Sequence, residues 1–152
     1  MKIRSIAAWT GTAALALLLA ACGQITGNAP SPPAPSTCVV PSGVQTQVLY
    51  PIPGATAVPA STVQIVFAIS SPLPGWGAAW STNTNANYGL AFQTISAGQV
   101  PSPSATPSFA NPIYVSSTLT TGLPAASVVG VFLNNLNSNC IPVSANASFT
   151  TQ

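Results

Sequence analysis

The sequence contains no aspartate, glutamate or histidine, and its two charged side chains, Lys2 and Arg4, both lie at the N-terminus. General acid–base catalysis normally uses a carboxylate or an imidazole, and a nucleophilic serine or cysteine needs such a group as its partner base. Calcium sites are built largely from carboxylates, and nucleic-acid binding requires Lys or Arg to neutralise phosphates. The composition therefore predicts a protein that is not an enzyme, holds no metal or cofactor and binds no nucleic acid.

The absence of carboxylates and histidines also bears on stability. Acid unfolding mainly reflects such groups, whose pKa values differ between the folded and unfolded states. We therefore expect the free energy of unfolding to be almost constant between neutral and acid pH. A net charge near zero favours association of free molecules, and tethering the protein would reduce that problem.

The N-terminal segment has the layout of an export signal. Lys2 and Arg4 precede an apolar run over residues 6–20, and small residues precede Cys22. That order is typical of a signal peptide, and the run is shorter than the roughly 20 apolar residues that a transmembrane helix needs. The alternative is an N-terminal anchor that is not cleaved.

The junction LAAC at residues 19–22 resembles the lipobox of bacterial lipoproteins. The resemblance implies cleavage before Cys22, a diacylglycerol on its thiol and acylation of the new amine with chains such as palmitate. Two or three acyl chains hold a protein stably on a bilayer, so the membrane is an implied partner. Gly23 stands where Gram-negative lipoproteins kept in the inner membrane often have aspartate, which favours the outer membrane.

The chain is expected to have three parts. Residues 1–21 form the helical signal peptide, residues 22–37 form the lipidated cysteine and a linker, and residues 38–152 form one domain. Four prolines within residues 30–35 favour an extended polyproline II spacer in the linker.

From residue 38 onward, short segments rich in Val, Ile, Phe, Tyr and Thr alternate with clusters of Pro, Gly, Asn and Ser. This is the strand-and-turn pattern of a sandwich or barrel. In residues 62–70, Val63, Ile65, Phe67 and Ile69 lie at alternate positions, so one face of that strand is expected to be buried. The pattern predicts seven strands, at residues 44–50, 62–70, 76–81, 88–95, 113–121, 127–134 and 141–151, with a long connection over 96–112.

Two stretches resemble immunoglobulin-like modules. The stretch YPIPGATAVP at residues 50–59, followed by a strand centred on Phe67, is similar to the opening of bacterial Ig-like domains. Residues 119–131, with FTT at 149–151, resemble the Leu-x-Pro corner and closing strand of fibronectin III-type domains, although Val129 stands where those domains usually have tyrosine. The resemblance implies an all-β, seven-stranded Ig-like or fibronectin III-like sandwich, in a module that binds, spaces or presents and is not an enzyme.

Assigning Cys22 to lipid leaves an even pair of cysteines, Cys38 and Cys140. Export to an oxidising compartment permits a disulfide. In the predicted sandwich Cys38 precedes the first strand and Cys140 begins the last, so both lie at the same end. We expect them to form a disulfide, with two buried free thiols as the alternative. A metal site is not expected, because no histidine or carboxylate is present to complete it.

One cluster of residues suggests a ligand. Trp76 and Trp80 flank a short segment that leads through an Asn- and Thr-rich run to Tyr88. Exposed aromatic faces beside amides suit sugars. The competing interpretation is that a tryptophan fills the core and the polar run is a turn, for which Asn is well suited.

The leading hypothesis is a lipid-anchored cell-envelope protein whose Ig-like domain has a structural, adhesive or protein-docking role. The alternative is a carbohydrate-binding module that uses exposed Trp76, Trp80 and Tyr88. Envelope proteins are the expected partners in the first case and glycans in the second.

Overall fold

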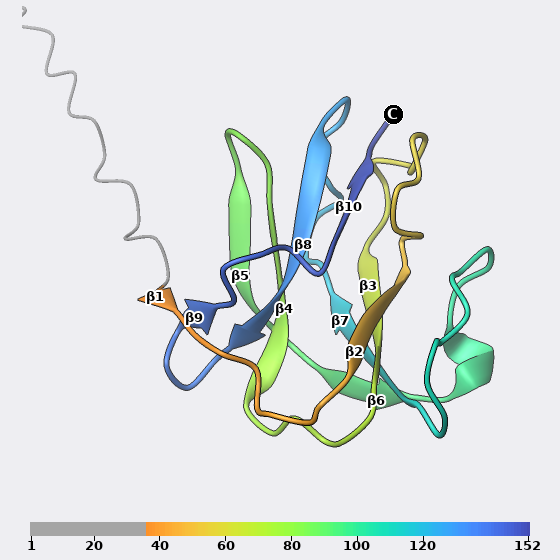
Figure 1. Ribbon diagram of the computed structural model, residues 1–152. Helices are drawn as coiled ribbons and strands as arrows, with labels where there is room; N and C mark the ends of the chain where they lie inside the picture. Colours follow the sequence, from red (N-terminus) through yellow and green to blue (C-terminus); the bar gives the residue numbers. More distant parts are fainter. Residues whose placement is uncertain (1–35) are drawn as a thin grey trace, which may run out of the picture. The chain divides into compact units, whose positions relative to one another are not determined.

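The computed structural model describes residues 36–152. The predicted signal peptide, Cys22 and the linker up to residue 35 lie outside the described residues. The described part is all-β, with strands arranged in two sheets as a sandwich (Figure 1). It contains ten strands, so the prediction of seven was too low.

The first sheet has the order β1-β9-β8-β4-β5, and the second has the order β2-β3-β7-β6. β10 pairs with β8 on the same edge as β9, because β4 occupies the other edge of β8. Neighbouring strands are antiparallel except for the parallel pair β1 and β9. The bounds are β1 Ser36–Thr37, β2 Thr46–Tyr50, β3 Gln64–Ile69, β4 Trp76–Ser81, β5 Ala86–Ala91, β6 Gln93–Ile95, β7 Ile113–Thr118, β8 Val128–Asn135, β9 Cys140–Ile141 and β10 Ala147–Thr150, with the 3-10 helix η1 at Ala97–Gln99.

Two of the predicted strands are each divided in the structure, which accounts for most of the difference in number. The segment predicted as 88–95 passes from one sheet to the other at Phe92, so it becomes the end of β5 and then β6. The segment predicted as 141–151 is interrupted after Ile141, and the chain rejoins β8 only at Ala147. The short strand β1 is the tenth.

The main core lies between the two sheets. On β3, the alternating residues Ile65, Phe67 and Ile69 are buried as predicted, whereas Val63 precedes the strand and is 51% exposed. Residues on the neighbouring strands β2 and β7 and on the facing sheet complete this core, namely Val48, Val115, Ala78, Trp80, Val129, Val131, Leu133 and Phe149.

The connection between β6 and β7 covers the outer face of the second sheet. Val66 and Ala68, on the opposite face of β3 from the main core, are also fully buried. Together with Leu49 they form a second apolar cluster, against which Phe109 and Tyr114 pack. Strand β3 is therefore buried on both faces, whereas the alternation in its sequence predicted burial of one face only.

The same connection also covers the edge of β2. The Ala105 backbone N–H donates to the Leu49 carbonyl at 2.9 Å. The Gln47 amide bridges the two segments, because its Nε2 donates to the Thr106 carbonyl at 3.0 Å and its Oε1 accepts from the Ser108 N–H at 2.8 Å. Exposed sheet edges invite pairing with other chains, and here the chain closes one of its own.

Candidate functional site

The two tryptophans proposed for sugar stacking lie in the core. Trp76 and Trp80 are each 7% exposed. They share the inward face of β4, which runs between β5 and β8 in the interior of its sheet. The alternative that required two exposed indoles is therefore not what the structure shows, and the competing interpretation, a tryptophan in the core, fits both residues, because alternate positions of this strand point into the sandwich. Tyr88 is half-buried on β5, so the three rings do not form a surface platform.

The polar run between Trp80 and Tyr88 is a turn. The Thr82 hydroxyl oxygen accepts from the Asn85 N–H at 3.0 Å and from the Thr84 N–H at 3.3 Å. The Thr82 N–H in turn donates to the Asn85 carbonyl at 2.7 Å. These local hydrogen bonds account for the composition of residues 82–85, which join β4 to β5.

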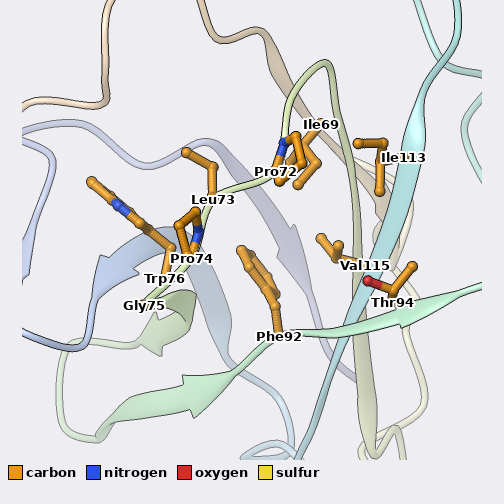
Figure 2. Close-up of a pocket in the computed structure, with 10 residues that line it drawn as sticks. All are labelled: Ile69, Pro72, Leu73, Pro74, Gly75, Trp76, Phe92, Thr94, Ile113 and Val115. Carbon is orange, nitrogen blue, oxygen red and sulfur yellow. The ribbon is translucent and has the colours of Figure 1, made fainter.

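An apolar pocket opens between the sheets where the chain passes from β5 to β6 (Figure 2). Its volume is about 280 Å³. Leu73 and Trp76 form one side, Ile113 and Val115 form the other, and the ring of Phe92 stands between them. The Phe92 ring also makes an edge contact with the ring of Phe67, with 5.4 Å between ring centroids.

The chemistry of this pocket suits an uncharged apolar group. Among its ten lining residues, Thr94 has the one polar side chain, and that residue is exposed at the β6 side. Binding sites for small molecules or side chains are typically apolar concavities with a few polar groups that fix orientation. The volume is at the lower limit for such sites, so the pocket fits one ring or a short aliphatic chain.

A second, smaller pocket of about 230 Å³ is lined by neutral polar and proline side chains. It includes Tyr50, Thr62 and Gln64. The Gln64 Nε2 donates to the Ser116 hydroxyl at 2.7 Å, and the buried Thr62 hydroxyl has no hydrogen-bond partner.

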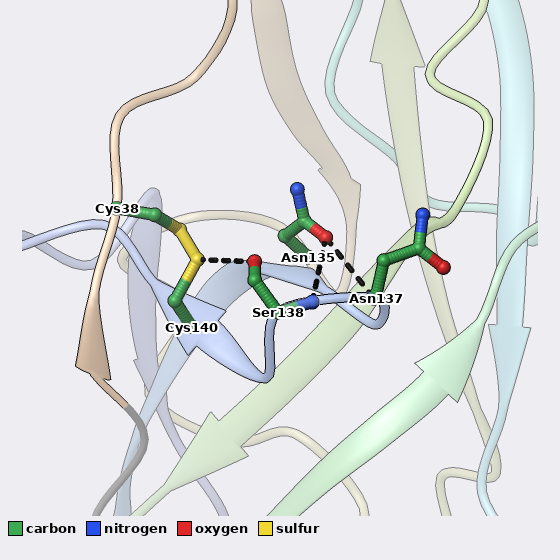
Figure 3. The surroundings of a disulfide bond; sticks show 5 residues. All are labelled: Cys38, Asn135, Asn137, Ser138 and Cys140. Atoms are coloured by element: carbon green, nitrogen blue, oxygen red, sulfur yellow. Dashed lines mark hydrogen bonds between the residues drawn. A yellow bond between two sulfur atoms is a disulfide. The ribbon is translucent and has the colours of Figure 1, made fainter.

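A disulfide joins Cys38 to Cys140, with 5.4 Å between the Cα atoms, which confirms the predicted pair (Figure 3). It fastens the segment after β1 to β9. The Ser138 hydroxyl lies 3.1 Å from the Cys140 sulfur. The turn before β9 is held by the Asn135 Oδ1, which accepts from the N–H groups of Asn137 and Ser138. The Asn-rich segment 134–139 therefore forms the hairpin turn between β8 and β9, beside the disulfide.

A buried serine links the two sheets. Ser117 on β7 is fully buried, and its hydroxyl donates to the Leu90 carbonyl at 2.6 Å. The same oxygen accepts from the Ala78 N–H at 3.3 Å. This N–H lies beside the register shift in the β4–β5 pair. Because the chain has no histidine or carboxylate to act as a base, the geometry is that of a structural bridge.

No local sequence pattern predicts the pocket between the sheets. Its walls come from a loop at 72–75, from Phe92 and from β7, which are widely separated in the chain. Pro72 and Pro74 lie between two predicted strands, and nothing in the local pattern indicates that they border a cavity.

Comparison with known proteins returned no match to a protein-family model, to a curated protein or to a solved structure. Within residues 36–152, no helix is long and apolar enough to cross a membrane. The same residues contain no cluster of three or more His, Cys, Asp or Glu side chains.

Proposed function

We propose that this chain is a cell-envelope lipoprotein, anchored through Cys22, whose Ig-like sandwich serves a structural or docking role. The observation that carries the proposal is the strand order. An immunoglobulin-like sandwich has sheets A-B-E-D and G-F-C, with C′ added beyond C in the variable type. The order β2-β3-β7-β6 corresponds to the first sheet, and β9-β8-β4-β5 corresponds to the second with C′.

The docking role is supported by the pocket between the sheets. A partner that inserts one apolar side chain beside Phe92 and Trp76 would meet apolar walls and a hydroxyl at Thr94. The chain has no charged side chain after Arg4, so the domain has none. Recognition of a partner therefore depends on shape and on neutral hydrogen bonds. Electrostatic steering, which raises association rates between oppositely charged surfaces, makes no contribution from this side of the complex.

The anchor is tested by replacing Cys22. Cys22→Ala should move the protein from the membrane fraction to the soluble fraction, and the mass of the unsubstituted protein should equal the chain from Cys22 plus acyl groups. Separation of inner and outer membranes then tests the outer-membrane assignment. A protein that begins at Met1 with a free Cys22 thiol would contradict the proposed anchor.

The docking role is tested by photo-crosslinking in intact cells. A photoreactive residue at Thr94, beside the pocket, should yield a discrete crosslinked species. The matched control carries the same residue at Val128, which is 66% exposed at the start of β8 and does not line the pocket. Equal labelling from both positions, or none from either, would contradict docking through this pocket.

A further inference from the structure

An exposed apolar patch surrounds the disulfide. The two large apolar side chains with the highest exposure among residues 36–152 are Val39 and Val143, at 88% and 83%. Each follows a cysteine of the disulfide in an apolar run, VVP after Cys38 and IPV after Cys140. We call these six residues the disulfide patch; Val39, Pro41 and Val143 are exposed, whereas Val40, Ile141 and Pro142 are half-buried, Val40 against the main core.

The fold holds the two halves of the patch together. β1 pairs in parallel with β9, with Thr37 opposite Ile141. The Cys38 N–H donates to the Ile141 carbonyl at 3.0 Å, and the disulfide joins the same two segments. Figure 1 shows β1 and β9 side by side at one margin of the sandwich. Val39 and Val143 therefore lie on two segments that the strand pairing, this hydrogen bond and the disulfide hold together.

We propose that the disulfide patch contacts the surface of the lipid bilayer when the protein is anchored; the inference rests on the proposed lipid anchor at Cys22. One half of the patch, Val39 to Pro41, follows the end of the linker directly, and the disulfide holds the other half beside it. Cys38 follows Cys22 by 16 residues (38 − 22). Even when fully extended at about 3.1 Å per residue, this linker keeps the patch within about 50 Å of the bilayer. Tethering makes their contact intramolecular, so a weak contact is sufficient.

The size and charge of the patch favour a bilayer over a second copy of the chain. A stable protein–protein interface uses about 20–30 residues from each partner, and the patch has six. Apolar side chains at a membrane interface enter the boundary between headgroups and acyl chains, to a depth of about 5–10 Å. Because the domain lacks Lys and Arg, the contact should be indifferent to anionic lipid and to salt, unlike that of a polybasic segment.

The test measures quenching of tryptophan fluorescence by brominated acyl chains. The full lipidated protein carrying Val143→Trp is placed on phosphatidylcholine vesicles that contain brominated lipid. The matched control is Val128→Trp, at an exposed valine outside the patch. The native Trp76 and Trp80 are buried and contribute a constant background to both variants. The added tryptophan at 143 should be quenched at least about two-fold more than that at 128, with and without phosphatidylserine or added salt.

Three outcomes would overturn the proposal. The first is equal quenching at positions 143 and 128. The second is quenching that requires phosphatidylserine or disappears in salt. The third is a dimer of the detergent-solubilised protein, seen by sedimentation, that Val143→Ser dissociates, because a second copy would then cover the patch.

The contact between the patch and the bilayer can be tested even if the proposed lipid anchor at Cys22 proves wrong. Mass spectrometry shows first whether Cys22 is acylated. If it is not, the proposed anchor fails, and the full chain is coupled through its Cys22 thiol to a maleimide lipid in the same vesicles. The comparison of positions 143 and 128 then tests the patch in the same way.

Discussion

At the scale of single residues, the hydroxyl of Ser117 links the two sheets beside the β4–β5 register shift. It satisfies the Ala78 N–H and the Leu90 carbonyl in a site without solvent access. A buried N–H without a partner retains the full cost of its desolvation. The side chain therefore compensates for a local defect in the ladder.

Ser117→Ala should lower the free energy of unfolding by about 1–3 kcal/mol, because it leaves these buried backbone groups without a partner. Chemical denaturation of the variant and the parent protein measures the difference. Ser148→Ala is the matched control, since Ser148 is exposed on β10, and it should change the value by less than about 0.5 kcal/mol. Equal effects of the two substitutions would show that the bridge does not stabilise the fold.

At the scale of structural elements, the connection 96–112 behaves as a third layer. It buries Val66 and Ala68 and is fastened to β2 through the Gln47 amide. Alternation along β3 predicted one buried face because a two-layer sandwich was assumed. The second face is buried by a segment that lies more than 25 residues further along the chain. The alternation of side chains within β3 cannot predict such a distant contact.

Gln47→Ala should release residues 105–108 without unfolding the sandwich. Loss of two hydrogen bonds, each contributing about 1 kcal/mol, should speed amide hydrogen exchange at Ala105 and Ser108 about tenfold or more. Gln93→Ala, at an exposed position of β6, is the control and should leave these amides unchanged. If exchange at Ala105 and Ser108 does not respond to Gln47→Ala, the connection is held by its apolar contacts instead.

The disulfide acts on elements that are distant in the sequence. It closes a loop with a sequence separation of 102 residues, for which the chain-entropy model gives an upper value of about 4–5 kcal/mol. Replacing both Cys38 and Cys140 by alanine should lower the melting temperature clearly and free β1 from β9. Cys22→Ala should leave the melting temperature unchanged, and a similar decrease in both proteins would contradict the assignment of separate roles.

At the scale of the whole molecule, the absence of ionisable side chains predicts an unusual response to acid. No carboxylate has a pKa lowered by folding, and no histidine has a pKa raised by it, since the chain has neither residue type. Apart from the chain termini, folding therefore neither binds nor releases protons between pH 7 and pH 3. The melting temperature should be almost constant over that interval, and a steep decrease would contradict the expectation.

The sequence by itself determined the features that depend on composition and local period. It predicts that acid–base catalysis is not the function, because the residue types that usually carry it, His, Asp and Glu, are absent. It predicted an all-β chain and the inward face of β3, because strand side chains alternate. It also predicted the pairing of Cys38 with Cys140, because the strands that carry them were expected at one end of the fold, and the structure confirms this pair.

The tertiary structure decided what depends on contacts between distant residues. It placed Trp76 and Trp80 in the core because they lie on the face of β4 that is turned toward the other sheet. From the sequence, an aromatic residue in a core strand cannot be distinguished from one on a binding surface. It divided two predicted strands, since the change of sheet at Phe92 has no local signature. It also left Val39 and Val143 exposed beside one disulfide. The sequence did not indicate this, because the two residues are 104 positions apart (143 − 39) and only the fold brings their segments together.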